Sequence, residues 1–182
     1  KRIFLAALLT SSLQASDTLF IEAEAFEDRG GWSVDSQFIL TMGSAYLMAH
    51  GLGTPVADAT TIVTFPSTGT YHLHVRTKDW VAKWEAPGTP GKFKISINDQ
   101  PATTTFGTQG AEWHWHNGGT IEVTSLKSTV KLHDLTGFNG RCDALYFTKD
   151  AKEVPPNDSQ ALFDFRRQKL NLPATPPTKG DY

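Results

Sequence analysis

The sequence has little cysteine and no concentration of one charge. Cys142 is the single cysteine among 182 residues, so a domain outside the cytoplasm could not rely on an internal disulfide and would depend on its core or on a metal ion. The formal net charge is −2 and the basic residues are scattered, which argues against nucleic acid and anionic membrane surfaces as partners. The length is sufficient for one domain with a substantial core.

Sequence motifs of common catalytic sites are also missing. The chain contains no Gly-x-Ser-x-Gly turn, no phosphate-binding P-loop and no Gly-x-Gly-x-x-Gly fingerprint. Acidic residues occur throughout, but none is singled out for glycoside hydrolysis. Cys142 begins an apolar segment and is expected to be a small buried hydrophobe rather than a nucleophile. We therefore expect a chain that is not itself an enzyme.

The first 15 residues have the three parts of a secretory signal peptide. Lys1 and Arg2 form a short basic region, residues 3–9 are apolar, and residues 11–15 are small and polar, with a cleavage position after Ala15. The apolar run is too short to span a membrane, so we expect an exported protein that works in the periplasm or outside the cell. The alternative is a short N-terminal core helix.

From residue 17 to about residue 150 the chain alternates between apolar and polar residues with the period of β-strands. Gly, Pro and Asn turns separate these segments, and no helical period appears. This pattern is typical of an all-β antiparallel β-sandwich or jelly roll. The expected strands are residues 20–26, 60–65, 71–76, 92–97, 120–124, 129–133 and 144–147.

The pattern changes toward the C-terminus. Residues 154–156, Val-Pro-Pro, interrupt the strands. Asn157 or Asp158 could cap a short helix over residues 159–170, within a linker segment of residues 151–172. The fold prediction is therefore a β-sandwich with a short C-terminal helix.

Three acidic residues are candidates for a structural calcium site. Glu22 and Glu24 are two apart on the first strand, so they project from the same face, and Asp143 begins the last strand. Neighbouring carboxylates repel unless they are solvated, protonated or bridged by a cation, and Ca²⁺ takes roughly six to eight oxygen ligands. The alternative is a pair of solvent-facing glutamates on an edge strand.

Four of the five tryptophans fall in two short polar stretches, residues 79–84 and 112–116. Large aromatic side chains on loops usually have a stacking partner, such as the C–H face of a sugar or another protein domain. Charged and amide side chains nearby could bind hydroxyl groups. The alternative is that Trp113 and Trp115 alternate into the core. The candidate ligand-binding residues are Arg76, Asp79, Trp80, Trp84, Trp113, His114, Trp115, Asn139 and Arg141, with Trp32 as a further aromatic.

Two His-x-His units offer a different kind of site. The pairs His72/His74 and His114/His116 each place two imidazoles on one strand face, which is a way for jelly-roll enzymes to bind a transition metal. The alternative is paired surface histidines on strands.

The segments Phe20–Phe26 and Gly140–Phe147 resemble those of carbohydrate-binding modules with the galactose-binding-like β-sandwich, notably families six and thirty-five. In those modules an opening Glu-x-Glu strand and an Asp near the last strand commonly hold a structural calcium. The resemblance therefore implies a galactose-binding-like fold, with Glu22, Glu24 and Asp143 in the calcium role.

A closer resemblance covers nearly all of the mature chain. Residues 22–32, 75–80, 110–115 and 134–143 resemble the N-terminal module of exported bacterial FAD-dependent oxidoreductases, found mainly in polysaccharide-degrading bacteria. Residues 173–182 are Pro-rich and typical of a semi-rigid linker to a domain that this sequence does not include. The resemblance implies that FAD belongs to that absent C-terminal domain.

These observations leave three functions open. The first is non-catalytic glycan binding through the loop tryptophans, with a structural calcium. The second is an accessory domain whose tryptophan loops dock on the catalytic domain of the parent oxidoreductase without binding sugar. The third is a metal-dependent jelly-roll enzyme that uses the His-x-His units.

Overall fold

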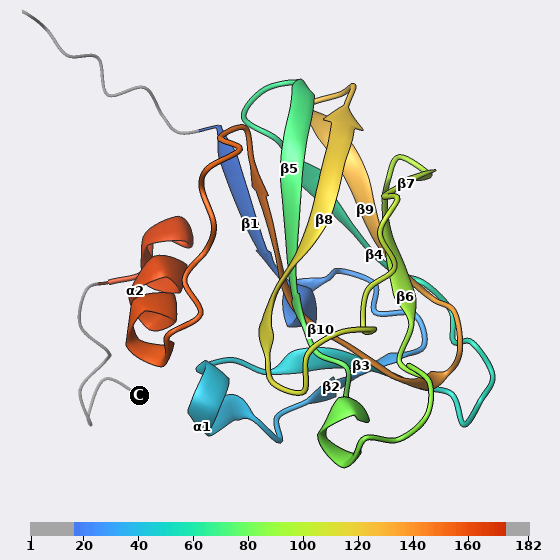
Figure 1. The fold of residues 1–182 in the computed structure, drawn as a ribbon. Helices are drawn as coiled ribbons and strands as arrows, with labels where there is room; N and C mark the ends of the chain where they lie inside the picture. Colours follow the sequence, from blue (N-terminus) through green and yellow to red (C-terminus); the bar gives the residue numbers. More distant parts are fainter. Residues whose placement is uncertain (1–16, 174–182) are drawn as a thin grey trace, which may run out of the picture.

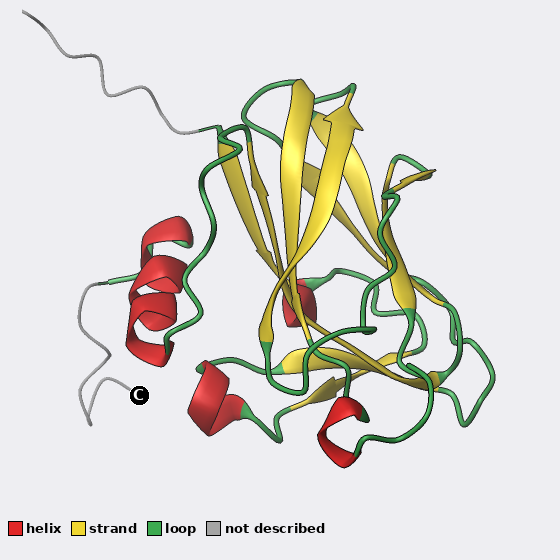
Figure 2. Cartoon of the chain, in the orientation of Figure 1, coloured by secondary structure: helices red, strands yellow, loops and turns green. Residues whose placement is uncertain are grey.

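The computed structural model of the chain describes residues 17–173. Two antiparallel β-sheets pack face to face into a β-sandwich (Figure 1, Figure 2). This confirms the all-β architecture expected from the alternating pattern. The predicted signal peptide, residues 1–15, and nearly all of the predicted Pro-rich linker lie outside the described residues. No helix between residues 17 and 173 has both the length and the apolar character needed to cross a membrane.

The larger sheet has six strands. They are β1 (Thr18–Glu22), β2 (Trp32–Asp35), β3 (Tyr46–His50), β5 (Gly69–Thr77), β8 (His114–Val123) and β10 (Phe138–Thr148). The order is β2-β3-β10-β5-β8, with β1 also paired to β10. The first residues of β10 pair with β3 and its later residues pair with β1. Both β1 and β3 are therefore hydrogen-bonded to this one strand.

The smaller sheet has four strands in the order β4-β9-β6-β7. They are β4 (Ala59–Thr64), β6 (Phe93–Ile97), β7 (Gln100–Pro101) and β9 (Lys127–Asp134). Short helical segments connect the strands of both sheets: η1 (Ala23–Ala25), α1 (Ile39–Met42) and η2 (Ala82–Trp84). The helix α2 (Ser159–Lys169) follows the last strand.

The main core lies between the two sheets. Leu73 and Leu145 from the larger sheet and Ile95 and Leu132 from the smaller one are fully buried there. Successive side chains of a strand point to opposite faces, so a register slip of one residue would turn each of these side chains away from this core. Cys142 belongs to the same core, as the sequence predicted.

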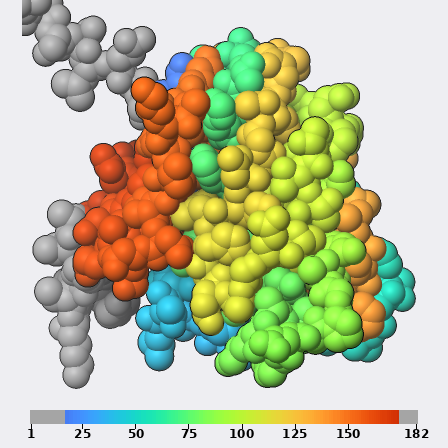
Figure 3. Space-filling view, in the orientation of Figure 1, coloured from blue at the N-terminus to red at the C-terminus, as the bar shows by residue number. Residues whose placement is uncertain are grey.

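The outer face of the larger sheet is covered as well, by α2 (Figure 1). Phe165 of α2 packs edge-on against Phe20, with ring centroids 5.8 Å apart, and against Tyr146 at 5.1 Å. In the space-filling view α2 lies flush against the side of the molecule, above α1 (Figure 3). The predicted linker helix is thus packed on the sandwich rather than separate from it.

The start of α2 follows from its capping residue. Of the two predicted caps, Asp158 takes the role, because its side chain accepts hydrogen bonds from the backbone N–H groups of Gln160 and Ala161. Three basic residues lie in the last turn, where they interact favourably with the helix dipole. The predicted helix is therefore confirmed to within one residue at its C-terminal end.

The strands β2 and β3 were not predicted from the sequence. In β3 the neighbouring residues Tyr46 and Leu47 are both fully buried, because both faces of the sheet are covered at this point. A strand that is buried on both faces does not alternate, so the two-residue period gives no signal. The segment His114–Asn117 was also not predicted as strand, although it extends β8 toward the N-terminus.

Candidate functional site

The candidate site centres on the loop between β5 and β6, which contains η2. The indole Nε1 of Trp80 donates a hydrogen bond to the carbonyl oxygen of Phe138 at 2.9 Å, which fixes this ring against the sandwich. The ring of Trp84 stands edge-on to it, with centroids 6.2 Å apart. Trp84 is 63% exposed. One anchored ring and one exposed ring thus lie side by side on a loop.

The two rings line a cleft of about 210 Å³, which we call the tryptophan cleft. Further lining residues come from the segments that precede α1 and β8. Aromatic rings beside hydrogen-bonding groups suit a ligand with apolar faces and polar edges. The lining residues are Gln37, Phe38, Lys78, Trp80, Lys83, Trp84, Glu112 and Arg141.

The tryptophan cleft carries more positive than negative charge. Lys78, Lys83 and Arg141 line it, and Glu112 is the one carboxylate in the lining. Burial lowers the pKa of the Lys78 ammonium, an effect that the nearby charge of Glu112 opposes. The cleft therefore favours ligands that are neutral or negatively charged.

Arg141 connects the cleft to the larger sheet. Its guanidinium lies 5.5 Å from the centre of the Trp80 ring, within the range of a cation–π interaction. Its Nε and Nη1 groups are buried and have no hydrogen-bond partner within residues 17–173. Arginine keeps its charge under all ordinary conditions, so this side chain offers a fixed positive group at the cleft wall.

Asp79, Asn139 and His114, which were predicted to bind ligand, lie close to the cleft but do not line it. Asp79 is buried, and its carboxylate accepts a hydrogen bond from the backbone N–H of Val81 at 3.2 Å. Asn139 Oδ1 lies 2.5 Å from His50 Nδ1. His114 Nδ1 lies 3.1 Å from the carbonyl oxygen of Glu112. Each of these three side chains thus contacts another group of the chain.

Trp113 was also predicted to bind ligand, but the structure places it in the interior, at 6% exposure. Its ring packs edge-on against Tyr46, with centroids 4.9 Å apart, and against Phe38 at 5.8 Å. The alternative in which this residue turns inward is therefore correct. Trp113 reaches the tryptophan cleft only indirectly, through Phe38.

Trp115 is half-buried beneath the segment that leads to α2. Its Nε1 donates a hydrogen bond to the carbonyl oxygen of Pro156 at 3.0 Å, and its ring stands edge-on to Phe20, with centroids 6.2 Å apart. Trp115 therefore anchors the C-terminal segment instead of facing a ligand. Trp32, the fifth tryptophan, lies in the main core against Phe93.

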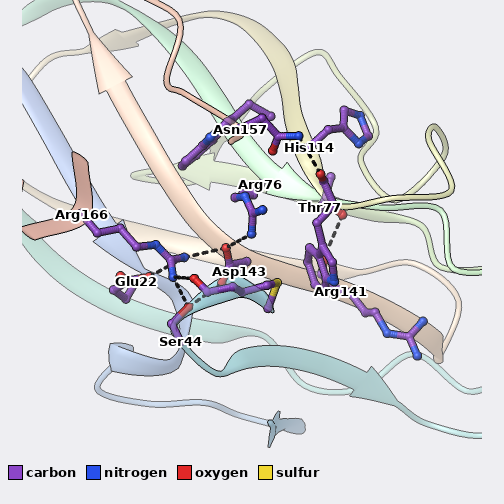
Figure 4. A network of polar contacts seen from close by, with 12 residues as sticks. Glu22, Ser44, Arg76, Thr77, His114, Arg141, Asp143, Asn157 and Arg166 are labelled. Atoms are coloured by element: carbon purple, nitrogen blue, oxygen red, sulfur yellow. Dashed lines mark hydrogen bonds and ion pairs between the residues drawn. The ribbon is translucent and has the colours of Figure 1, made fainter. Parts of the chain in front are cut away.

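Arg76, another predicted ligand-binding residue, belongs to a buried network around Asp143 (Figure 4). The Asp143 Oδ2 atom accepts hydrogen bonds from Arg76 Nη1 at 2.9 Å and from Arg166 Nη2 at 2.6 Å. The Oδ1 atom accepts one from Ser44 Oγ at 3.0 Å. We call this set, together with Glu22, the Asp143 cluster. Arg76 thus neutralises a buried carboxylate and is not available to a ligand.

The three predicted calcium ligands do not fit an ion as they are arranged. Arg166 Nη2 lies 3.3 Å from Glu22 Oε2, so a positive group already stands between Glu22 and Asp143. The Oε2 atom of Glu24 is buried without a hydrogen-bond partner in the described part of the chain. Among residues 17–173 no group of three or more His, Cys, Asp or Glu is placed to hold a metal ion. We therefore assign no role through calcium, which stays a prediction of the sequence.

The two glutamates have unusual acidity. Burial is the main cause that raises the pKa of Glu22 to about 8, against the attraction of Arg166 and with a contribution from the charge of Asp143. Burial also raises the pKa of Glu24 to about 7. A glutamic acid that keeps its proton near neutral pH does not require a bridging cation.

The two His-x-His units do not form one site. His116 is opposite Val75, a core residue, and its ring packs against Phe106. His74 is the neighbour of Val75 in β5, so its side chain points to the opposite face of the sheet, toward Tyr146. The two units therefore cannot bind one metal ion together, which the hypothesis of a metal-dependent enzyme using both units required.

Several residues of the tryptophan cleft were not predicted as site residues. Gln37 and Phe38 come from a segment without a recognisable motif, and they reach the cleft because β2 and β3 fold beside β10. Lys78, Lys83 and Glu112 are neighbours in sequence of predicted residues. Their proximity to the tryptophans was the one signal that could have identified them.

Comparison with known proteins gives the fold. No known family profile matches the sequence, and no curated protein matches it. Solved structures do match. The chain resembles the GH26-CBM35 β-(1,4)-mannanase of Podospora anserina with a TM-score of 0.57 and 15% identity, over 78% of this chain and 29% of the mannanase chain.

For two isolated modules, the match covers nearly the whole of the other chain. The C-terminal CBM6 of a marine laminarinase from Zobellia galactanivorans has a TM-score of 0.53 at 15% identity, over 72% of this chain and 99% of the module. A family 35 carbohydrate-binding module from Clostridium thermocellum has a TM-score of 0.52 at 18% identity, over 71% of this chain and 96% of the module. The chain therefore has the jelly-roll fold of carbohydrate-binding modules.

Proposed function

We propose that this chain is a non-catalytic module that binds glycans at the tryptophan cleft. The fold shared with carbohydrate-binding modules supports this function, and so does a cleft that combines two indole rings with charged hydrogen-bonding groups. Export, and a parent FAD-dependent oxidoreductase with its FAD in a separate domain, belong to the same proposal. The signal-peptide pattern of residues 1–15 supports export, and the resemblance of the sequence supports the parent enzyme.

The observation that carries the proposal is the exposure of Trp84. An indole ring that is 63% exposed leaves a large apolar surface in water, although Trp80 next to it is anchored by a hydrogen bond. The C–H faces of a sugar ring would cover that surface, and Lys83 and Arg141 would bind hydroxyl or carboxylate groups at its edge.

Substitution of Trp84 tests the proposal. We expect Trp84→Ala to weaken glycan binding roughly tenfold or more without a change in the melting temperature, because the ring is a stacking surface and not part of the core. Isothermal titration calorimetry with plant and algal polysaccharides would measure the change. Val154→Ala is the matched control, since Val154 is 67% exposed and does not line the cleft. Absence of binding by the unaltered chain to every glycan would refute the function.

A second candidate function is docking on the catalytic domain of the parent enzyme. Exposed apolar side chains next to the cleft favour it: Leu40 of α1 is 100% exposed and Ile39 is 45% exposed. Such surfaces commonly mark protein contacts. Sedimentation of the chain mixed with the separately produced parent domain would test this function. A complex that Leu40→Ser abolishes and Trp84→Ala leaves intact would favour docking over glycan binding.

A further inference from the structure

Four oxygen atoms, three from the Asp143 cluster and one from the backbone of Met42, lie around one positive group. The guanidinium of Arg166 lies 2.6 Å from Asp143 Oδ2, 3.3 Å from Glu22 Oε2 and 2.9 Å from the carbonyl oxygen of Met42. It also donates a hydrogen bond to Ser44 Oγ (Figure 4). Carboxylate, carbonyl and hydroxyl oxygens are the donors that hard divalent cations such as Ca²⁺ take. The oxygen set is thus of the kind that binds a metal ion, but a side chain fills it.

The helix α2 holds this guanidinium in place. Arg166 is 5% exposed, and Leu162, one turn earlier on the same face of the helix, is 1% exposed. Phe165 packs on Phe20 of β1. The guanidinium can therefore leave the cluster only if the helix separates from the sheet. Removing one partner of a buried ion pair is strongly destabilising, because the other charge stays buried without compensation.

The second arginine makes the cluster still less suited to a metal ion. Arg76 Nη1 lies 2.9 Å from the same Asp143 oxygen that binds Arg166. A divalent ion placed beside that oxygen would meet the repulsion of two guanidinium groups. A metal could enter only after Arg166 had been removed.

We propose that Arg166 is the resident cation of the Asp143 cluster. Its guanidinium takes the place of a divalent ion between Glu22 and Asp143, so that α2 makes the sandwich independent of metal. The sequence predicted calcium because its acidic motif can be recognised. Arg166, which contacts these acidic residues, lies on α2, far from them in the sequence. This role is separate from glycan binding and does not depend on it.

The test compares melting temperatures of the full chain in EDTA and in about 2 mM CaCl₂. For the unaltered protein we expect the same melting temperature in both. For Arg166→Met we expect a fall of about 5–10 °C in EDTA. Asp143 then keeps only Arg76 as a cationic partner, and the other oxygen atoms around the guanidinium lose their donor. Calcium should restore about half of that loss in melting temperature. Without Arg166 the oxygen atoms are free to bind the ion, and one repelling guanidinium has been removed.

Arg167→Met is the matched control on the same helix. The Arg167 guanidinium lies 5.0 Å from the centre of the Phe163 ring and forms no ion pair within the described residues. This variant should melt close to the unaltered protein in both solutions. Arg166→Lys keeps one positive charge, so it should fold and remain insensitive to calcium even where Arg166→Met does not fold.

Three results would overturn the proposal. The first is an unaltered protein that calcium stabilises and EDTA destabilises, because a metal would then be the resident cation. The second is an Arg166→Met variant as stable as Arg167→Met. The third is an Arg166→Lys variant that calcium stabilises, since the retained charge should exclude the ion. The measurement on the unaltered protein decides the matter independently of how any variant folds.

Discussion

Arg76 and Arg141 both lie beside a tryptophan ring, yet their guanidinium groups have different roles. The Arg76 group lies 6.0 Å from the Trp113 ring and is bound to the buried Asp143 carboxylate. The Arg141 group lies over Trp80 and lines the tryptophan cleft. Only the second has charge to offer a ligand, so the ligand preference of the cleft should depend on Arg141.

Replacement of Arg141 should therefore change which glycans bind. We expect Arg141→Met to weaken binding of carboxylate-bearing glycans roughly tenfold and of neutral glycans much less, because a charged hydrogen bond is lost only with the former. Affinity electrophoresis with paired acidic and neutral polysaccharides would measure this. For the unaltered chain, binding of acidic glycans should weaken with added salt. Equal losses for both classes would contradict a charge-based role.

Cys142 makes a second prediction at this scale. The thiol is fully buried, and burial together with the charge of Asp143 raises its pKa well above the ordinary value. We expect no reaction with a thiol reagent in the native protein at neutral pH, because the thiolate is the reactive form. Absorbance after addition of Ellman's reagent would show it, with protein in guanidinium chloride as the reactive control. Rapid labelling of the native chain would mean that the strand β10 opens locally.

The helix α2 was predicted as part of a linker, but it packs on the larger sheet. It covers Phe20 and Tyr146 on the outer face of the larger sheet, and the segment before it binds the indole of Trp115. An element held by aromatic contacts, a hydrogen bond and a buried ion pair is part of the domain. Its local stability therefore contributes to the stability of the whole sandwich.

The capping residue of α2 allows that contribution to be measured. Asp158→Ala removes two hydrogen bonds to backbone N–H groups and should cost about 1 kcal/mol, which corresponds to a fall of roughly 2–4 °C in melting temperature. Asp164→Ala is the control, since Asp164 lies on the same helix beyond its first turn. Among the described residues, the Gln160 side chain alone donates hydrogen bonds to its carboxylate, at 3.3 Å. If Asp158→Ala leaves the melting temperature unchanged, α2 does not unfold together with the sandwich.

For the whole molecule, the acidity of Glu22 predicts how stability depends on pH. The folded chain holds this proton up to a pKa of about 8, whereas an ordinary glutamic acid loses it near 4.5. Between these values the folded state binds more protons than the unfolded state, so the free energy of unfolding falls as pH rises. The contribution is complete below about pH 4.5 and is lost as pH passes 8.

Glu22→Gln isolates this effect, because the amide has the same shape and no proton to lose. We expect the two proteins to melt at similar temperatures near pH 5 and the unaltered chain to melt lower than Glu22→Gln near pH 9, by roughly 5 °C or more. Calorimetry across this range would measure the difference. A difference that is constant with pH would mean that Glu22 titrates normally in the folded chain.

The sequence predicts the fold well and the site only in part, for reasons visible in particular residues. Strands with one solvent-facing side, such as β6, alternate and can be recognised. The strand β3 does not alternate, because Tyr46 and Leu47 are both buried. Trp84 could be recognised as exposed from its polar loop. Trp115 could not be recognised as covered, because Pro156 reaches it from a distant part of the chain. The alternation of apolar and polar residues predicts a single strand. It does not predict which other segments will lie beside that strand, and these contacts depend on that.

The pairing of β1 with β10 also has a consequence for the order in which the chain can fold. Thr18 is opposite Thr148, so β1 has no strand to pair with until β10, the last strand, has been made. Bringing such distant segments together has an entropic cost that precedes any stabilising contact, which slows folding. Glu22 contacts Arg166 only after α2 has also been made. A chain leaving the ribosome therefore lacks its finished larger sheet until β10 has been made.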